Sequence, residues 1–293
     1  MDLTHDSVDY RASGGGGMTA TIGISEPTGT EPRYRAANFA DALHSEWTKA
    51  RTVPSARWTL IVATVLGIGL GALVSALSAR HYAQETPGSR ALWDPTSISG
   101  AGLELAQLAI GVLGIMIITS EYSTGAIRTG LTAVPRRGRF LAAKALVIAG
   151  LTFAVSEIIA FGAFFTGQAL ISGHAPTASL GQPDVLRALL GCGLYGALIG
   201  LLGLGLGALL RHASAAIAVL VALVFILPAI AAALPASIEH KVEKFWPTQA
   251  GQQVTLVVRG ADSLSPWAGI GYLCLFTAVV MAASAVLLNR HDA

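Results

Sequence analysis

Six long apolar segments constrain the fold of this chain more than any other feature of its sequence. A helix crosses the hydrocarbon core of a bilayer in roughly 20 residues, and each segment reaches about that length. Inside lipid every backbone N–H and C=O must be bonded within the protein, and single segments of this kind meet that demand only as helices. We therefore predict an all-α integral membrane protein with six transmembrane helices at about 58–79, 100–120, 145–173, 188–210, 213–234 and 267–289.

The composition supports a membrane class. Hydrophobic residues make up 53% of the 293 residues, and charged residues only 12%, about half the share in a typical soluble domain. The formal net charge of +2 gives no indication of a nucleic acid partner, and we expect none. Cys192 and Cys274 both fall within predicted spans, where we expect small buried hydrophobes rather than metal ligands.

Basic residues predict the orientation of the spans. With a cytoplasmic N-terminus, ten lysines and arginines flank the inner ends and six flank the outer ends. Their densest cluster lies in the short loop after the second span, where the positive-inside rule works best. Both termini are then cytoplasmic. The first 57 residues contain no apolar signal-peptide core, so we expect the first span to be an uncleaved anchor.

Two different segments precede the first span. Residues 1–35 are rich in glycine, serine, threonine and acids, and we expect a disordered tail. Residues 36–53 predict an amphipathic helix that Asn38 caps and Pro54 ends. Such a helix is expected to lie flat at the inner membrane surface, the alternative being an ordinary soluble helix. Its apolar face carries Phe39, Leu43 and Trp47, and the charged residues Glu46 and Lys49 accompany them.

A polar loop, residues 121–144, separates the second span from the third and contains another helical pattern. Apolar residues recur at i, i+4 and i+7 from Ile127, which predicts a short amphipathic helix over 123–134, capped by Ser123 or Thr124. Lipid phosphates would account for the basic residues of this loop, but they leave the polar turn at its start unexplained. A protein partner on the cytoplasmic side would account for both.

Several polar residues fall within the predicted spans, where ionisable groups are costly and often functional. Glu157 would line the translocation path or pair with a basic group; alternatively, it would be protonated and bond to a neighbouring helix. Glu104 lies near an outer end and could simply snorkel. The outer segment 235–266 either caps the bundle or forms a solvated loop with interfacial aromatics. The intramembrane polar residues are Glu104, Gln107, Glu157 and Gln168.

Three blocks of sequence carry a resemblance to a known family. They are Glu46-Trp47-Thr48-Lys49-x-Arg51 before the first span, and Ile118-Thr119-Ser120-Glu121-Tyr122-Ser123-Thr124-Gly125 and Ala133-Val134-Pro135-Arg136-Arg137 after the second. Together they resemble the six-span permease subunits of the exporter-type ATP-binding cassette transporters called ABC-2. The later Phe245-Trp246-Pro247 resembles the actinobacterial branch of that family. The likeness covers about residues 37–291.

The resemblance implies an assembly in a bacterial plasma membrane. Two permease chains, identical or different, would associate with a dimer of ATP-binding cassette ATPase subunits. In such families the first cytoplasmic loop carries a coupling helix that docks on the ATPase, and a connecting helix precedes the first span. Glu46, Trp47 and Lys49 would lie in that connecting helix. The positions that match the coupling segment are Glu121, Tyr122, Ser123, Thr124, Arg128, Arg136 and Arg137.

Motifs for self-contained catalysis are missing from the sequence. It contains no Gly-x-x-x-x-Gly-Lys-Ser/Thr phosphate loop, no His-Glu-x-x-His and no Gly-x-Ser-x-Gly. We therefore expect a transport subunit rather than an enzyme, without metal or cofactor of its own, since its partner binds the ATP. The family suggests export of an apolar or amphiphilic solute. The alternatives are an ion-gradient-driven transporter or channel using Glu157, an intramembrane enzyme using Glu157 or Glu104, and a membrane scaffold.

Overall fold

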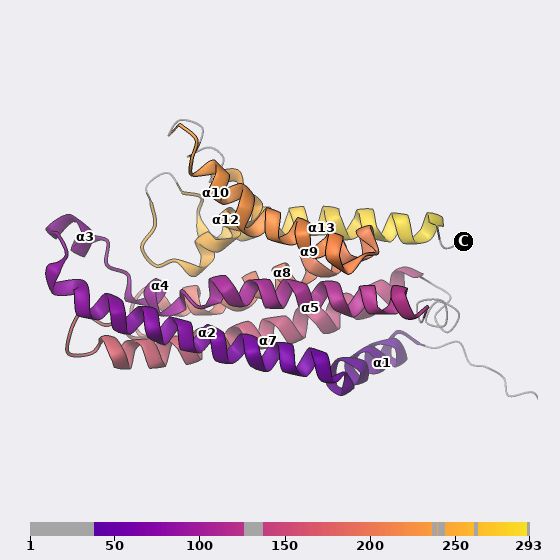
Figure 1. Ribbon diagram of the computed structural model, residues 1–293, viewed down its shortest axis with the longest axis horizontal. Helices are drawn as coiled ribbons and strands as arrows, with labels where there is room; N and C mark the ends of the chain where they lie inside the picture. The colour runs from indigo at the N-terminus through magenta and orange to yellow at the C-terminus, as the bar shows by residue number, and fades with distance from the viewer. Residues whose placement is uncertain (1–37, 126–136, 236–238, 240–243, 261–262, 292–293) are drawn as a thin grey trace, which may run out of the picture. The chain divides into compact units, whose positions relative to one another are not determined.

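The structure is a computed structural model that describes residues 38–125, 137–235, 239, 244–260 and 263–291. All regular elements among these residues are helical, and none is a strand. Six helices of this described part are long and apolar enough to cross a membrane, which confirms the predicted fold class. In chain order they are α2 (Pro54–His81), α5 (Leu103–Thr124), α7 (Arg137–Ile171), α8 (Val185–Leu210), the composite of α9 (Ala213–Val221), a π-helical segment (Ala222–Ile226) and α10 (Leu227–Ala231), and α13 (Pro266–His291), as Figure 1 shows.

Helix α8 forms the centre of the bundle. It packs against α5, α7 and α13 and also contacts α9. Tyr195, Ile199, Leu202 and Leu204 of α8 are at most 1% exposed. The turn from α8 into α9 contains only Arg211 and His212, which confirms the tight antiparallel connection that the sequence predicts. The helices α5, α7, α9 and α13 therefore surround α8 and shield it.

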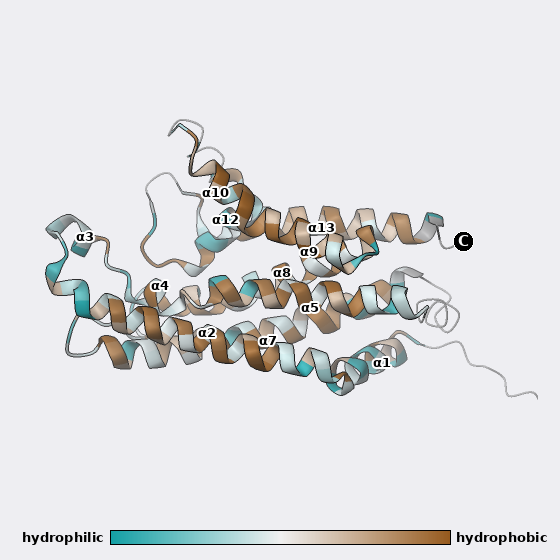
Figure 2. Ribbon diagram, viewed as in Figure 1, coloured by the Kyte–Doolittle hydropathy of each residue, from teal (hydrophilic) through white to brown (hydrophobic). Residues whose placement is uncertain are grey.

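The outward faces of α2 and α13 are apolar, as Figure 2 shows. Trp58, Val65 and Leu66 of α2 are between 62% and 64% exposed. A soluble protein rarely exposes such large contiguous apolar patches, whereas hydrocarbon solvates them without cost. Cys274 of α13 is also exposed and only Cys192 is buried, so the expectation of two buried cysteines is wrong for one of them.

Glycines set the distance between α5 and α8. A Cβ added at Gly203 of α8 would collide with the backbone carbonyl of Gly111 on α5, and a Cβ at Gly114 with that of Gly200. The two backbones therefore touch at positions where any larger residue would separate them. Close approach of this kind is how helices associate in lipid, where no hydrophobic force drives them together.

Helices α5 and α7 extend further toward each other than the sequence predicts. The predicted second span ends at residue 120, but α5 continues to Thr124 and ends at Gly125, whose φ of +71° lies in the left-handed region. Helix α7 begins at Arg137 rather than at 145. The polar connection is thus residues 125–136 instead of 121–144. Residues 126–136, with most of the predicted short helix 123–134, lie outside the described residues.

The fifth span is interrupted near its outer end. Pro228 has no N–H to donate to the carbonyl four residues before it, and a π-helical turn immediately precedes α10. The carbonyl of Leu223 in this turn accepts a hydrogen bond from the Trp246 indole at 2.7 Å and from the Thr248 hydroxyl at 3.4 Å. The Phe-Trp-Pro motif thereby attaches the outer segment to the fifth span.

The described part of the outer segment caps the bundle. It contains α12 (Pro247–Gln252) and a 3-10 turn (Gln253–Thr255), in which Val254 is fully buried. The Arg187 guanidinium donates to the carbonyls of Val254 and Leu256 at 2.8 and 2.9 Å. Asp94, which precedes α4 (Pro95–Gly100), accepts from two backbone amides of the segment at 3.0 and 3.1 Å. Of the two alternatives for this segment, these contacts favour the cap.

Candidate functional site

The predicted interfacial helix is present as α1 (Phe39–Thr52). At the start of α1 the backbone N–H of Asn38 donates to the Asp41 carboxylate at 2.8 Å. At its end the chain turns at Val53, and Pro54 begins α2. Phe39 and Trp47 are 37% and 43% exposed, whereas Leu43 is half-buried. Much of the apolar face that the sequence predicts is therefore directed away from the bundle, where lipid or a partner could cover it.

The buried face of α1 is partly charged. Glu46 is 5% exposed and lies between Lys49 of the same helix and Lys144 of α7. Its two oxygens accept from Lys49 Nζ at 2.7 Å and from Lys144 Nζ at 2.5 Å. A carboxylate that the sequence places beside the apolar face of a surface helix is thus buried against the bundle.

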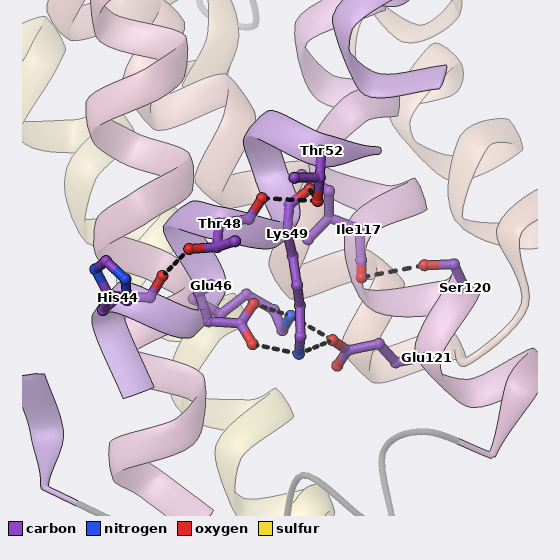
Figure 3. Close-up of polar contacts among 9 residues, drawn as sticks. His44, Glu46, Thr48, Lys49, Thr52, Ile117, Ser120 and Glu121 are labelled. Carbon is purple, nitrogen blue, oxygen red and sulfur yellow. Dashed lines mark hydrogen bonds and ion pairs between the residues drawn. The ribbon is translucent and has the colours of Figure 1, made fainter. Parts of the chain in front are cut away.

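Four charged side chains form a closed cluster at this point, which we call the charge cluster: Glu46, Lys49, Glu121 and Lys144. Glu121 Oε1, from α5, accepts from Lys49 Nζ at 3.0 Å and from Lys144 Nζ at 2.9 Å, so each charge has two opposite neighbours. Figure 3 shows Glu46, Lys49 and Glu121 converging from α1 and α5. The formal charges sum to zero, and the cluster joins α1 to α5 and α7, which are far from α1 in sequence.

Burial and ion pairing shift the pKa values of Glu46 and Lys49, the two cluster members on α1, in opposite directions. Burial raises the pKa of Glu46, but the charge and hydrogen bond of Lys144, with help from Lys49, leave that pKa below its usual value. Burial likewise lowers the pKa of Lys49, but hydrogen bonds to Glu46 and Glu121 leave it above its usual value. Both shifts favour the charged forms, so both residues are ionised at neutral pH.

Lys144 is the cluster member whose role the sequence reasoning missed. Its position in the predicted loop suggested one more basic anchor at the inner surface, but it lies within α7, 1% exposed, with its ammonium 5.2 Å from the centroid of the Phe140 ring. A signal was present in the sequence, because apolar residues surround Lys144 at helical spacing. A lysine inside such a pattern needs an acidic partner, and Glu46 and Glu121 are two of the acids expected at the same side of the membrane.

The residues around Glu121 belong to the last turn of α5. The hydroxyls of Ser123 and Thr124 both donate to the carbonyl of Ser120, at 3.0 and 2.8 Å. They therefore satisfy carbonyls at the end of α5 instead of capping a new helix, and the predicted helix start at this point is wrong. The Arg211 guanidinium lies over the Tyr122 ring, with its carbon 5.5 Å from the centroid of that ring.

The structure describes only one of the three arginines predicted for ATPase coupling. Arg128 and Arg136 lie outside the described residues, and Arg137 is the first residue of α7. The described neighbours Glu121 and Tyr122 lie at the end of α5, directly before the connection. The structure thus brings Glu46, Lys49 and Glu121 together, and it leaves the coupling role of the basic residues a prediction.

Glu157 occupies a different environment within α7. Its carboxylate packs against α8, where a Cβ added at Gly193 would collide with it. Both of its oxygens are buried without a hydrogen-bond partner among the described residues. The predicted alternative of pairing with a basic group is therefore not found in this part of the chain.

Gln168 stabilises the outer end of α7. Its amide nitrogen donates to the Pro95 carbonyl at 3.0 Å and to the Ser99 hydroxyl at 3.1 Å. Its amide oxygen accepts from the backbone N–H of Ala178 at 2.7 Å. These three bonds tie α7 to α4 and to the loop that follows α7, which is a structural role.

Glu104 and Gln107 line a cavity of about 350 Å³ beneath the outer segment, together with Tyr195 and Trp246. Gln107 is 2% exposed; its oxygen accepts from the Tyr195 hydroxyl at 2.6 Å and its nitrogen donates to the Glu104 carbonyl at 2.9 Å. Glu104 is exposed as well as lining this cavity, and its snorkelling stays a prediction.

Comparison with known proteins adds no family to this description. No model of a known protein family matches the chain, and no curated protein matches its sequence. The class is defined by the fold: six apolar helices make the chain a multi-pass, all-α membrane protein. The further assignment has to be argued from the charge cluster and its position.

Proposed function

We propose that the chain is the permease subunit of an exporter-type ATP-binding cassette transporter in a bacterial plasma membrane, with both termini cytoplasmic. It would work with a second permease chain and a dimer of ATPase subunits that bind the ATP. The observation that supports this proposal best is the charge cluster. It attaches α1 to the ends of α5 and α7, and these two helices are the ones that the connection 125–136 joins.

The cluster suggests how such a subunit would respond to its ATPase. A force on the connection would act directly on the ends of α5 and α7. Because Lys144 and Glu121 are both bonded to α1, the three helices would shift together instead of sliding past one another. The ATPase can change the state of the bundle only if its affinity differs between the two states.

Coupling is tested by charge reversal in the connection. With the chain and its ATPase co-expressed, we expect Arg128→Glu combined with Arg136→Glu to abolish co-purification of the ATPase while membrane insertion is retained. Arg90→Glu is the matched control, because Arg90 lies in the short helix α3 (Pro87–Ala91) between the first two spans, at the predicted outer side. Undiminished co-purification with the double variant would contradict the predicted docking segment.

Transport is tested in vesicles. Solute movement by the reconstituted chain should require the ATPase and ATP. An ion-gradient-driven transporter is the second candidate, which the unpartnered, buried carboxylate of Glu157 favours. That candidate predicts transport that continues without the ATPase, stops with an uncoupler and is lost in Glu157→Gln.

A further inference from the structure

A cavity of about 380 Å³ adjoins the charge cluster, between α1, α2, α5 and α7. This volume is within the range of roughly 300–1,000 Å³ that is usual for ligand sites. Its polar end is formed by the four charged residues of the cluster, and most of its remaining wall is apolar. The apolar side chains of the wall include Val53, Val112, Leu113, Met116, Ile117 and Val147.

The length of the apolar wall matches one leaflet of a bilayer. From Val112 to Glu121 the wall follows α5 over nine residue-to-residue steps, which corresponds to about 14 Å at the rise of an α-helix. Half of the hydrocarbon core of a typical bilayer is about 15 Å thick. An acyl chain that lies along this wall therefore has its polar head at the level of the charge cluster.

Two polar groups of the cluster are free to bind such a head. Glu121 is 8% exposed and lines the cavity, and its Oε2 atom is buried without a hydrogen-bond partner among the described residues. Lys49 Nζ has three N–H donors, of which its bonds to Glu46 and Glu121 use two. Its side chain is 49% exposed and lines the cavity, so the third donor is left for a ligand there.

These free groups define the chemistry of the head. One acceptor oxygen is complementary to an ammonium with N–H donors, and one ammonium donor is complementary to a phosphate oxygen. Because the four charges of the cluster sum to zero, a zwitterion adds no net charge to this partly buried site, whereas an anion or a cation would.

We propose that this cavity binds a zwitterionic bilayer phospholipid with a primary ammonium head, of the phosphatidylethanolamine type. The ammonium donates to Glu121 Oε2, the phosphate accepts from Lys49 Nζ, and one acyl chain lies against Met116 and its neighbours. The lipid thereby covers the gap between α1 and α5. This inference does not depend on transport, because the site requires neither nucleotide nor a partner chain.

Native mass spectrometry of the purified full chain in detergent tests the head specificity. The probes are phosphatidylethanolamine, phosphatidylcholine, which has no N–H donor, and phosphatidylglycerol, which has no ammonium. We expect phosphatidylethanolamine to bind at least about tenfold more tightly than either, or 1.4 kcal/mol. Equal binding of phosphatidylethanolamine and phosphatidylcholine would overturn the proposal.

Two variants separate the tail from the head. Met116→Trp fills the apolar wall without altering the cluster and should weaken phosphatidylethanolamine binding about tenfold. Leu105→Trp, on the same helix and exposed to a similar extent (57% against 45% for Met116) but outside the wall, is the matched control and should leave binding unchanged. Glu121→Gln should remove the preference for phosphatidylethanolamine over phosphatidylcholine. If Glu121→Gln does not fold, Met116→Trp decides: unchanged binding in that variant refutes the site.

Discussion

Replacing Lys144 with methionine tests whether the charge cluster stabilises the bundle. Its ammonium is 1% exposed and lies 2.5 Å from Glu46 Oε2 and 2.9 Å from Glu121 Oε1. Methionine has a similar length but no charge, so two buried carboxylates would then face the single ammonium of Lys49. Removing one partner of a buried ion pair typically costs about 3–5 kcal/mol, and we expect Lys144→Met to lower the free energy of unfolding by that amount.

Lys49 provides the matched comparison within the same cluster. It contacts the same two carboxylates, at 2.7 and 3.0 Å, but its side chain is 49% exposed. Water screens such a pair, so Lys49→Met should cost no more than about 1 kcal/mol. Adding Glu46→Gln to Lys144→Met should recover part of the larger loss, because it removes the excess negative charge.

Equilibrium unfolding of the full chain in mixed micelles, followed by circular dichroism at neutral pH, measures these differences. The double-mutant cycle of Lys144→Met and Glu46→Gln isolates the coupling between the two residues. The reasoning is refuted if the losses in Lys144→Met and Lys49→Met agree within about 0.5 kcal/mol, the tolerance within which independent mutational effects usually add. In that case burial of the cluster would contribute nothing beyond a surface ion pair.

Three further predictions concern pH, helix packing and the outer cap. The pKa of Glu46 is lowered on folding, so its stabilising contribution is present above its usual pKa and is lost as pH falls through the lowered value. The melting temperature should therefore fall as pH is lowered below the usual value of 4.5, and it should fall less in Glu46→Gln. Gly203→Leu should destabilise the bundle by about 3 kcal/mol or more, because its Cβ meets the Gly111 carbonyl rather than a flexible side chain. Gly69→Leu is the control: its Cβ has open space around it, so the same unfolding assay should show almost no change in stability. Trp246→Phe removes the indole donor from the Leu223 carbonyl and should lower the free energy of unfolding by about 1–3 kcal/mol. Trp267→Phe, at a residue that is 63% exposed, is the control. Equal losses in the two variants would show that the hydrogen bond does not anchor the outer segment.

The six spans could be predicted from the sequence because lipid imposes a strict demand on it. A helix that crosses hydrocarbon must be long and apolar over its whole length, so its signal is local in the sequence. The helix ends were predicted less well, because polar side chains can continue a helix. Ser123 and Thr124 belong to a polar turn by composition, yet their hydroxyls bond to the Ser120 carbonyl and belong to α5.

The charge cluster could be predicted only in part. Glu46, Lys49 and Glu121 were selected individually, but their contact depends on how α1 lies on the bundle. The apolar residues Phe39 and Trp47 predict a face toward the membrane surface, and nothing in the sequence of α1 indicates that Glu46 is buried against α7. Long-range ion pairs such as that between Glu46 and Lys144, 98 residues apart, leave no periodic signal in the sequence.

Charges add to the apolar contacts of Ala42 with Phe140 and Ala143 in attaching α1, and this has a mechanical consequence. In a lipid environment apolar contacts are exchanged for lipid at little cost, so they would let α1 rotate or slide. A shift of α1 by one residue would rotate Glu46 by about 100° around the helix axis and remove it from Lys144. That loss costs about 3–5 kcal/mol, more than the roughly 1–3 kcal/mol of a typical allosteric coupling. Any displacement of α5 and α7 at residues 125–136 should therefore move α1 as part of the same rigid unit.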